Sequence, residues 1–414
     1  MKKKFFIIAL VFVVFGLRIN AQTVDTTTTP VEIQSITIEK HPLDWYEQQS
    51  HLWEKCVLEN PQNEYAWHNY FKSVFYHELQ ADTVSSVAIA EVCRKMGEAI
   101  PNTYRYYYCM YRNLCLNHQL DSADIFAQKA LEALPDSIQG DEINTLIAFL
   151  WYKGVNEDPD SKQYECFLKL LQKQYEAPLY PEKLFRYMYN QFQGMEDNGI
   201  YFFSGDNAGF PAIILQNVLN VHKDKQVVCV PFLYLESYCD ALFKRLGIKP
   251  FKSADDYLSM NLSLELWMSD LIQYIIRESG RPGYFCGVEM YYLPDTLTHF
   301  LYNEGLLLRY SPKPYDNIAS TKKIVETKYH LEYLNEPEFT PSNKHPEYEG
   351  MQLNYVMMLS HLIPFYRADG EKEKALWLQQ LLTDVINNTQ VNENFKRHCF
   401  QILDENTNLD ENTK

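Results

Sequence analysis

Two short apolar runs separated by a segment of helical length constrain this fold more than any other feature of the sequence. Residues 199–203 are apolar and aromatic, and residues 226–232 are rich in Val, as buried strands are. Residues 210–221, between the two runs, carry apolar side chains at helical spacing, and so do residues 236–246. A strand, a helix and a second strand form a βαβ unit, in which the strands pair in parallel.

Two further runs, residues 284–288 and 305–310, have the composition of short strands. We therefore predict a sheet of three or four strands, most of them parallel. Glycine is scarce, with 15 residues, and tyrosine is abundant, with 31, which favours helices packed on helices in the rest of the chain. The predicted fold class is mainly α with a small α/β unit.

Residues 45–76 have a helix–turn–helix pattern, in which Pro61 ends the first helix and Asn63 can cap the second. The pattern resembles a tetratricopeptide-type hairpin, and similar fragments occur at residues 121–135 and 355–387. No strict period of about 34 residues links these fragments. We therefore predict degenerate tetratricopeptide-like hairpins on both sides of the sheet.

The N-terminus has the three parts of a secretory signal. Lys2, Lys3 and Lys4 form a positive start, residues 5–17 carry no charge, and Ala21 offers a small residue for cleavage. The apolar run is short for a membrane-spanning helix, which needs roughly 20 residues. We predict an exported, periplasmic protein that is cleaved after Ala21; an N-terminal anchor that stays uncut is the alternative.

The predicted organisation combines these patterns. The segment that follows the signal is rich in Thr and polar, which indicates a flexible lead-in. The predicted parts are a signal peptide (1–21), the lead-in (22–40), a tetratricopeptide-like helical domain (41–195), a small α/β domain (196–335) and a C-terminal helical segment (336–414).

Charge and cysteine content exclude several classes of function. The formal net charge is −16, and an acidic surface disfavours binding to nucleic acid or to anionic lipid. After the signal, no stretch of the sequence has the length and apolar character of a transmembrane helix. The nine cysteines form no CxxC motif, which disfavours a zinc site; buried thiols and a structural disulfide both remain open.

The turn after the first predicted strand carries the main candidate for ligand binding, Gly205-Asp206-Asn207. Ligands collect at the carboxyl ends of parallel strands, where a helix start offers free backbone N–H groups. In the alternative interpretation, Asp206 or Asn207 only caps the following helix. The sequence has no GxGxxG or GxxxxGK[ST] motif, so we expect no nucleotide cofactor, and we assign no metal ligand and no catalytic residue.

The same residues carry a resemblance to a known family. The segment 198–211, followed by Gln216, Asp224 and the segment 302–310, is similar to the extramembrane C-terminal part of multi-pass Bacteroidetes proteins that resemble protein O-mannosyltransferases. The family pattern differs at three positions, which are Ala208, Gly209 and Cys229 in this chain. The resemblance implies a stand-alone relative of the soluble domain, in the cell envelope and without the membrane-embedded half. It adds Gln216 to the candidate ligand-binding residues.

Two functions are compatible with these patterns. The first is a non-enzymatic scaffold of the bacterial cell envelope, whose helical hairpins form a groove for a protein or glycan partner. The second is a carbohydrate-active or glycosylation-accessory protein that uses the Gly205-Asp206-Asn207 turn. The two hypotheses differ in the role of Asp206, which is a ligand contact only in the second.

Overall fold

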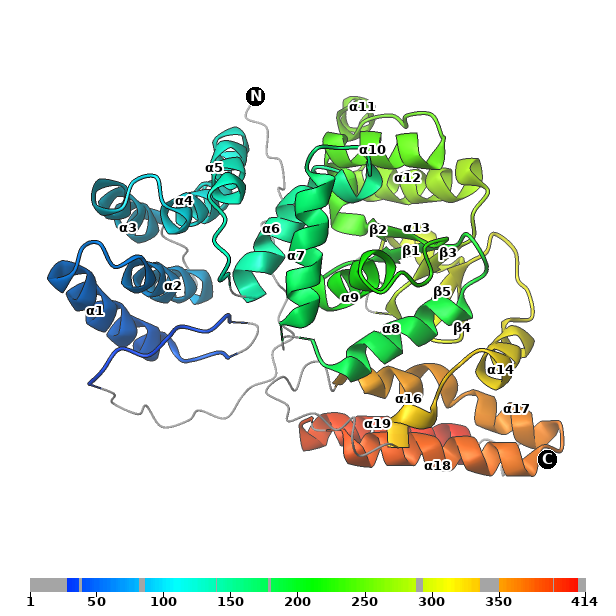
Figure 1. The fold of residues 1–414 in the computed structure, drawn as a ribbon. Helices are drawn as coiled ribbons and strands as arrows, with labels where there is room; N and C mark the ends of the chain where they lie inside the picture. Colours follow the sequence, from blue (N-terminus) through cyan, green and yellow to red (C-terminus); the bar gives the residue numbers. More distant parts are fainter. Residues whose placement is uncertain are drawn as a thin grey trace. The chain divides into compact units, whose positions relative to one another are not determined.

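The structure is a computed structural model, and it divides into two compact units, Met1–Leu146 and Ile147–Lys414 (Figure 1). It describes residues 28–36, 39–81, 86–138, 140–177, 180–287, 293–335, 350–389 and 391–408. The predicted signal peptide lies outside the described residues. The division at residues 146 and 147 falls well before the predicted domain boundary at 195 and 196, because the helices that follow residue 147 pack with the sheet.

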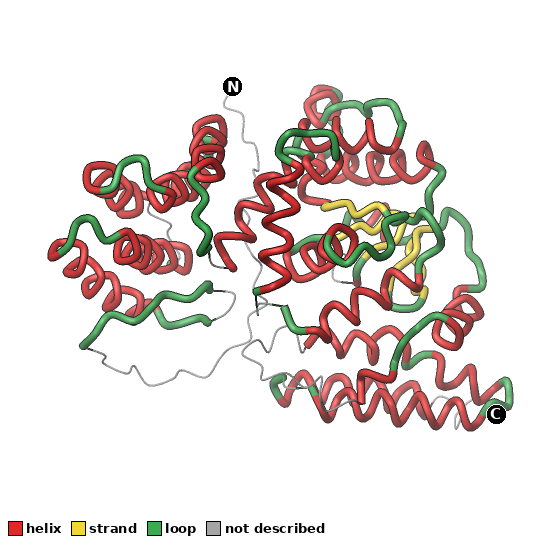
Figure 2. Tube along the Cα trace, in the orientation of Figure 1, coloured by secondary structure: helices red, strands yellow, loops and turns green. Residues whose placement is uncertain are grey.

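The predicted class, mainly α with a small α/β unit, is confirmed (Figure 2). Among the described residues, no helix combines the length and the apolar character needed to cross a bilayer. The helices of the first unit are α1 (Leu43–Glu59), α2 (Glu64–Gln80), α3 (Ser86–Ala99), α4 (Tyr104–Leu116), α5 (Leu120–Glu132) and α6 (Gly140–Tyr152), the last of which crosses into the second unit.

The α1–α2 hairpin forms as its sequence predicts. Helix α1 ends before Pro61, and the Asn63 side chain caps α2 by accepting a hydrogen bond from the backbone N–H of Ala66 at 3.1 Å. In α5, the small residues Ala123, Ala127 and Ala130 are fully buried, which allows the helix to pack closely against α4.

Part of the predicted flexible lead-in forms hydrogen bonds with α1 and α2. Backbone N–H groups of Val31 and Ile33 donate to the side-chain carbonyls of Gln49 and Asn69, each at 2.8 Å. Trp53 donates its indole N–H to the Val31 carbonyl at 2.9 Å. The segment is polar in sequence, but two buried amide side chains satisfy its backbone, and Ile33 is 1% exposed.

The second unit contains one five-stranded mixed sheet among its described residues, where three or four mostly parallel strands were predicted. Its strands are β1 (Ile200–Phe203), β2 (Gln226–Cys229), β3 (Gly283–Phe285), β4 (Leu301–Glu304) and β5 (Leu307–Tyr310), in the order β2-β1-β3-β5-β4. Strand β1 pairs in parallel with β2 and β3, and β5 pairs antiparallel with β3 and β4. The extra strand, β4, is partly polar and forms a hairpin around Gly305, whose φ is +65°.

Helices surround this sheet and form a further layer at the C-terminus (Figure 1). The α-helices are α7 (Tyr164–Glu176), α8 (Glu182–Gly194), α9 (Asp206–Asn217), α10 (Glu236–Leu246), α11 (Ala254–Ser259), α12 (Leu264–Ser279), α13 (Asp295–Thr298), α14 (Asn317–Thr327), α16 (Asn354–Leu359), α17 (Leu362–Ala368), α18 (Lys372–Asn388) and α19 (Glu393–Asn408). Short 3-10 turns are η1 (Val155–Glu157), η2 (Val230–Tyr234), η4 (Glu332–Asn335) and η6 (Met351–Leu353).

The side chains of β1 pack on helices and on the neighbouring strand β3. The Tyr201 ring lies 5.3 Å from that of Phe192 on α8, and Phe203 stacks on Trp151 of α6 at 5.3 Å. On the other side, Phe202 stacks on Phe285 of β3 at 4.8 Å. All four residues of β1 are buried, so the apolar run in the sequence reflects a strand covered on both faces.

Helix α8 connects the sheet to the C-terminal helices through two buried amide side chains. Asn190 donates to the His330 carbonyl and to the Tyr355 hydroxyl, both at 2.7 Å, and accepts from the His330 N–H at 2.9 Å. Gln191 accepts from the Tyr201 hydroxyl on β1 and donates to the Leu306 carbonyl, both at 3.3 Å. Since both amides are almost fully buried, their hydrogen bonds fix the position of α8.

We predict that Asn190→Ala lowers the free energy of unfolding by about 3 kcal/mol, because it removes two hydrogen bonds to the partly buried His330 backbone and one hydrogen bond of the buried Tyr355 hydroxyl. Urea denaturation of the purified protein measures this loss. The control is Gln172→Ala, an amide truncated at an exposed position of α7, which should change stability by about 0.5 kcal/mol or less. Equal stabilities of the two variants would contradict the role assigned to Asn190.

Candidate functional site

The Gly205-Asp206-Asn207 turn follows β1 and begins α9. Gly205 is the residue that precedes the helix; its φ is +81°, a conformation that favours glycine. No side chain caps α9 through a hydrogen bond at Gly205, and Asp206 and Asn207 are the first two helical residues. Gly205 therefore occupies the N-cap position, and the carboxylate of Asp206 lies in the first turn, where it interacts favourably with the helix dipole.

The turn has the position in the sheet that the sequence predicts for a ligand site. Strand β1 lies between β2 and β3, at the point where the order of the parallel strands reverses. The chain that leaves β3 continues through Cys286 and Gly287 into residues 288–292, which lie outside the described residues. Of the residues at this end of the sheet, the turn after β1 is described. Its Gly205 is exposed, and Asp206 and Asn207 are half-buried.

Gly209, where the family pattern has Thr, allows α9 to lie close to β1. A Cβ atom at this position would lie 2.3 Å from the ring of Phe203. Because backbone and ring occupy this space, a larger residue requires a different packing of the helix on the strand. The lack of a side chain at Gly209 is thus matched to the large ring of Phe203.

Gln216, the fourth predicted site residue, holds the loop between α9 and β2. Its amide donates to the carbonyls of His222 and Lys225 at 2.9 and 2.7 Å, and the side chain is buried. It lies about 15 Å along the helix axis from Asp206, at 1.5 Å per residue. The structure therefore does not bring Gln216 together with the Gly205-Asp206-Asn207 turn, and it gives Gln216 a structural role.

Asp224, another residue of the resemblance, fixes the same loop. Its carboxylate accepts from the Asn198 N–H at 3.0 Å and from the Lys225 ammonium at 2.6 Å. Burial raises the pKa of Asp224, but these hydrogen bonds outweigh burial and hold the pKa below its ordinary value. The residues that carry the resemblance around β1 and β2 thus stabilise the sheet.

Glu304 at the end of β4 and Arg309 in β5, two further residues of the resemblance, also make contacts that stabilise the sheet. The buried Glu304 carboxylate accepts from the Tyr315 hydroxyl at 2.8 Å and pairs with the Arg309 guanidinium at 3.3 Å. Between them, Gly305 approaches Tyr329 so closely that a Cβ would lie 2.2 Å from the Tyr329 hydroxyl. These contacts close the hairpin, and they engage the Glu304 carboxylate within the fold.

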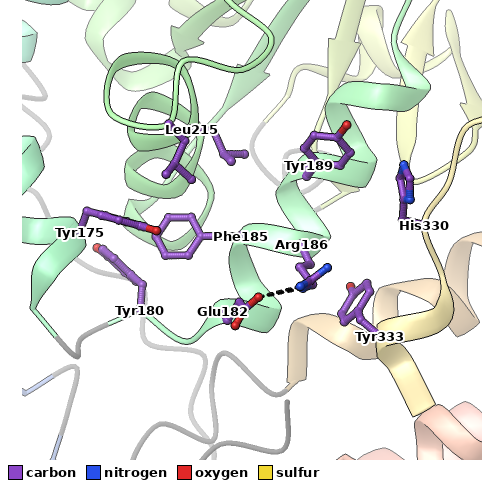
Figure 3. Close-up of a pocket in the computed structure, with 10 residues that line it drawn as sticks. Tyr175, Tyr180, Glu182, Phe185, Arg186, Tyr189, Leu215, His330 and Tyr333 are labelled. Atoms are coloured by element: carbon purple, nitrogen blue, oxygen red, sulfur yellow. Dashed lines mark hydrogen bonds and ion pairs between the residues drawn. The ribbon is translucent and has the colours of Figure 1, made fainter. Parts of the chain in front are cut away.

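An aromatic pocket in the second unit is the strongest candidate for a binding site (Figure 3). Its volume is about 620 Å³, within the range of small-molecule sites. We call it the aromatic pocket and define it by its lining residues, which are Tyr175, Tyr180, Glu182, Phe185, Arg186, Tyr189, Leu215, Leu219, His330 and Tyr333.

One wall of the aromatic pocket consists of three rings. Tyr175 and Tyr180 approach Phe185 edge to face, with ring centroids 5.6 and 6.3 Å apart from it. Tyr180 and Phe185 are buried, whereas Tyr175 stays 39% exposed at the rim. This wall therefore combines two buried rings, those of Tyr180 and Phe185, with the accessible ring of Tyr175.

The opposite wall contains Tyr189, His330 and Tyr333, with a charged pair beside them (Figure 3). The rings of Tyr189 and His330 lie 5.7 Å apart, and the Arg186 guanidinium lies 5.9 Å from the centre of the Tyr333 ring. Burial raises the pKa of Tyr333 well above 10, so its hydroxyl stays protonated at neutral pH.

The charged pair is Glu182 and Arg186, one helical turn apart on α8. Two nitrogen atoms of the Arg186 guanidinium donate to the same Glu182 oxygen, at 3.0 and 2.8 Å. The Glu182 and Arg186 side chains are 58% and 42% exposed, so water reaches both. The pair places a hydrogen-bond acceptor and a donor next to each other with compensating charges.

The sequence patterns did not predict the aromatic pocket. None of the four predicted site residues lines it, and Leu215 contributes from the end of α9 that is far from Asp206. A signal was present, because aromatic residues are unusually dense between Tyr175 and Phe192 and Glu182 and Arg186 have helical spacing. His330 and Tyr333 join the pocket through the tertiary fold, which local patterns do not encode.

Two buried ionic clusters outside the aromatic pocket have structural roles. In the first unit, Arg105 binds the Glu142 carboxylate and the Nδ1 of His68, and burial together with Arg105 holds the pKa of His68 well below 6.5. In the second unit, Glu157 accepts from Gln226 at 2.7 Å, and burial raises the Glu157 pKa against the opposing effect of Arg245. Both carboxylates are enclosed by the core.

Comparison with known proteins adds no functional assignment. No protein-family model matches the chain, and no curated protein matches its sequence. The resemblance to the O-mannosyltransferase-like proteins therefore stays a prediction from the sequence. Within the described ranges, no group of three or more His, Cys, Asp or Glu side chains is arranged to hold a metal ion, and the nine cysteines, all of them described, form no disulfide.

We predict that Asp206→Asn lowers the free energy of unfolding by about 1 kcal/mol, because it removes a negative charge from the first turn of α9. Asp206→Glu keeps the charge and should retain most of the stability. Urea denaturation at low and high salt measures both effects, and salt should reduce the difference between the variants. Unchanged stability of Asp206→Asn would instead favour the ligand-contact hypothesis for this carboxylate.

Proposed function

We propose that this protein is an exported, non-catalytic interaction protein of the bacterial cell envelope, which binds its partner in the aromatic pocket. The pocket is the observation that carries the proposal. It has the size of a ligand site, and it combines buried aromatic side chains with a few polar groups, which is the usual composition of such sites.

The chemistry of the lining residues supports binding over catalysis. Among the lining residues that the structure describes, Glu182 is the only acidic one, and it is engaged by Arg186. The lining residues include no Ser, Thr or Cys that would serve as a nucleophile next to His330. The proposed export to the cell envelope is supported by the sequence alone, because the positive start, the apolar run and Ala21 have the pattern of an export signal.

The scaffold hypothesis from the sequence places the binding groove in the helical hairpins, most of which are predicted in the stretch 41–195, with the α/β unit as a second surface. Helices α7 and α8, which supply half of the lining residues, belong to that stretch but pack against α9 of the second unit. We therefore propose that the partner binds at the junction of α7, α8 and α9, with the hairpins of the first unit as a separate surface.

A cross-linking experiment in cells tests this proposal. A photoreactive phenylalanine analogue replaces Tyr175 in the pocket, or Tyr234, which is 41% exposed and lies outside the pocket, as the matched control. We expect the protein in the periplasmic fraction and a discrete adduct from position 175 alone. Recovery of the protein in the cytoplasm, or equal adducts from both positions, would refute the proposal.

A further inference from the structure

We propose that the ligand of the aromatic pocket is a neutral saccharide, which packs a sugar ring on the rim tyrosine and hydrogen-bonds to the charged pair. This inference rests on the proposed function, because it names the ligand class of the same pocket. Three properties of the lining residues support it: accessible aromatic faces, adjacent donors and acceptors, and compensated charge.

The aromatic wall provides a surface for a sugar ring. One face of a pyranose consists largely of C–H groups, which are slightly positive and pack well on the negative face of an aromatic ring. Tyr175 is held edge to face against Phe185 and is 39% exposed, so part of its ring is accessible. Figure 3 shows Tyr175, Phe185 and Tyr180 gathered on one side of the pocket.

The charged pair provides the hydrogen bonds. Each sugar hydroxyl both donates and accepts, and neighbouring hydroxyls therefore suit a carboxylate next to a guanidinium. Glu182 and Arg186 have this arrangement within one helical turn, and both are partly exposed. The half-buried Tyr189 and the exposed His330 add further polar groups along the opposite wall.

Charge compensation disfavours the other small-ligand classes. A phosphate or carboxylate in the pocket would approach the Glu182 carboxylate, and an ammonium group would approach the Arg186 guanidinium. Neither ligand gains from a pair that is already neutral. A polyhydroxylated ligand without charge gains hydrogen bonds from both members and repels neither.

A peptide is the nearest competitor, and the lining residues fit it less well. Strand addition requires an exposed sheet edge, whereas α7, α8, α9 and the segment of His330 and Tyr333 form this pocket. A bound helix needs a continuous apolar groove, but Glu182 and Arg186 interrupt the aromatic lining. A proline-rich peptide on the aromatic rings is the alternative that the experiment must separate.

The test is calorimetric titration of the full purified chain with defined probes. The probes are the neutral hexasaccharides of glucose, mannose, xylose and N-acetylglucosamine, a polygalacturonate hexamer as the charged sugar, and a ten-residue polyproline peptide. We expect at least one neutral hexasaccharide to bind with a Kd below about 1 mM. Tyr175→Ala should weaken this binding about tenfold, as expected when a sugar loses an aromatic ring.

Tyr234→Ala is the matched control, since it removes a tyrosine of similar exposure elsewhere in the second unit and should leave the affinity unchanged. Thermal unfolding confirms that both variants fold. Tyr175-dependent binding of polyproline or polygalacturonate, without binding of a neutral sugar, would overturn the saccharide assignment but keep the pocket as a binding site. Absence of binding by every neutral sugar also overturns it, whereas the cross-linking result decides the proposed function.

Discussion

The amide side chains of Asn190 and Gln191 are the interaction on which the second unit depends. One amide holds the segment of His330 and the other holds β1 through Tyr201, so a single turn of α8 joins the sheet to the C-terminal layer. Both amides are nearly inaccessible to water, and an unpaired amide in such a place is costly. The same helix carries Arg186 one turn earlier, which sets the aromatic pocket on a rigid support.

This arrangement separates the residues that maintain the fold from those that face a ligand. The motif residues Gln216, Asp224 and Glu304 bind loops, backbone groups and neighbouring side chains within the second unit. Of these three residues, only Gln216 was a predicted ligand-binding residue, and the resemblance to the family pattern was the reason for that prediction. In this structure their hydrogen bonds stabilise strands of a small sheet, and the accessible polar pair lies on α8.

The sequence predicted those elements whose stability is local. The α10 helix has the predicted bounds, and β1 and β2 lie within the predicted apolar runs, because buried strands and helices leave a periodic apolar pattern. Strand β4 escaped prediction because Tyr302 and Asn303 are polar and gain their place from pairing with β5. The aromatic pocket escaped for a similar reason, since His330 reaches α8 only through long-range hydrogen bonds of the folded chain.

Native-state hydrogen exchange tests the central claim most directly. If α8 joins the layers, backbone amides in β1, α8 and α16 should open with the same free energy and the same dependence on urea, as one cooperative unit. Amides of α16 that exchange through a separate opening, of lower free energy than that of β1, would show that the C-terminal layer is independent and would contradict the account.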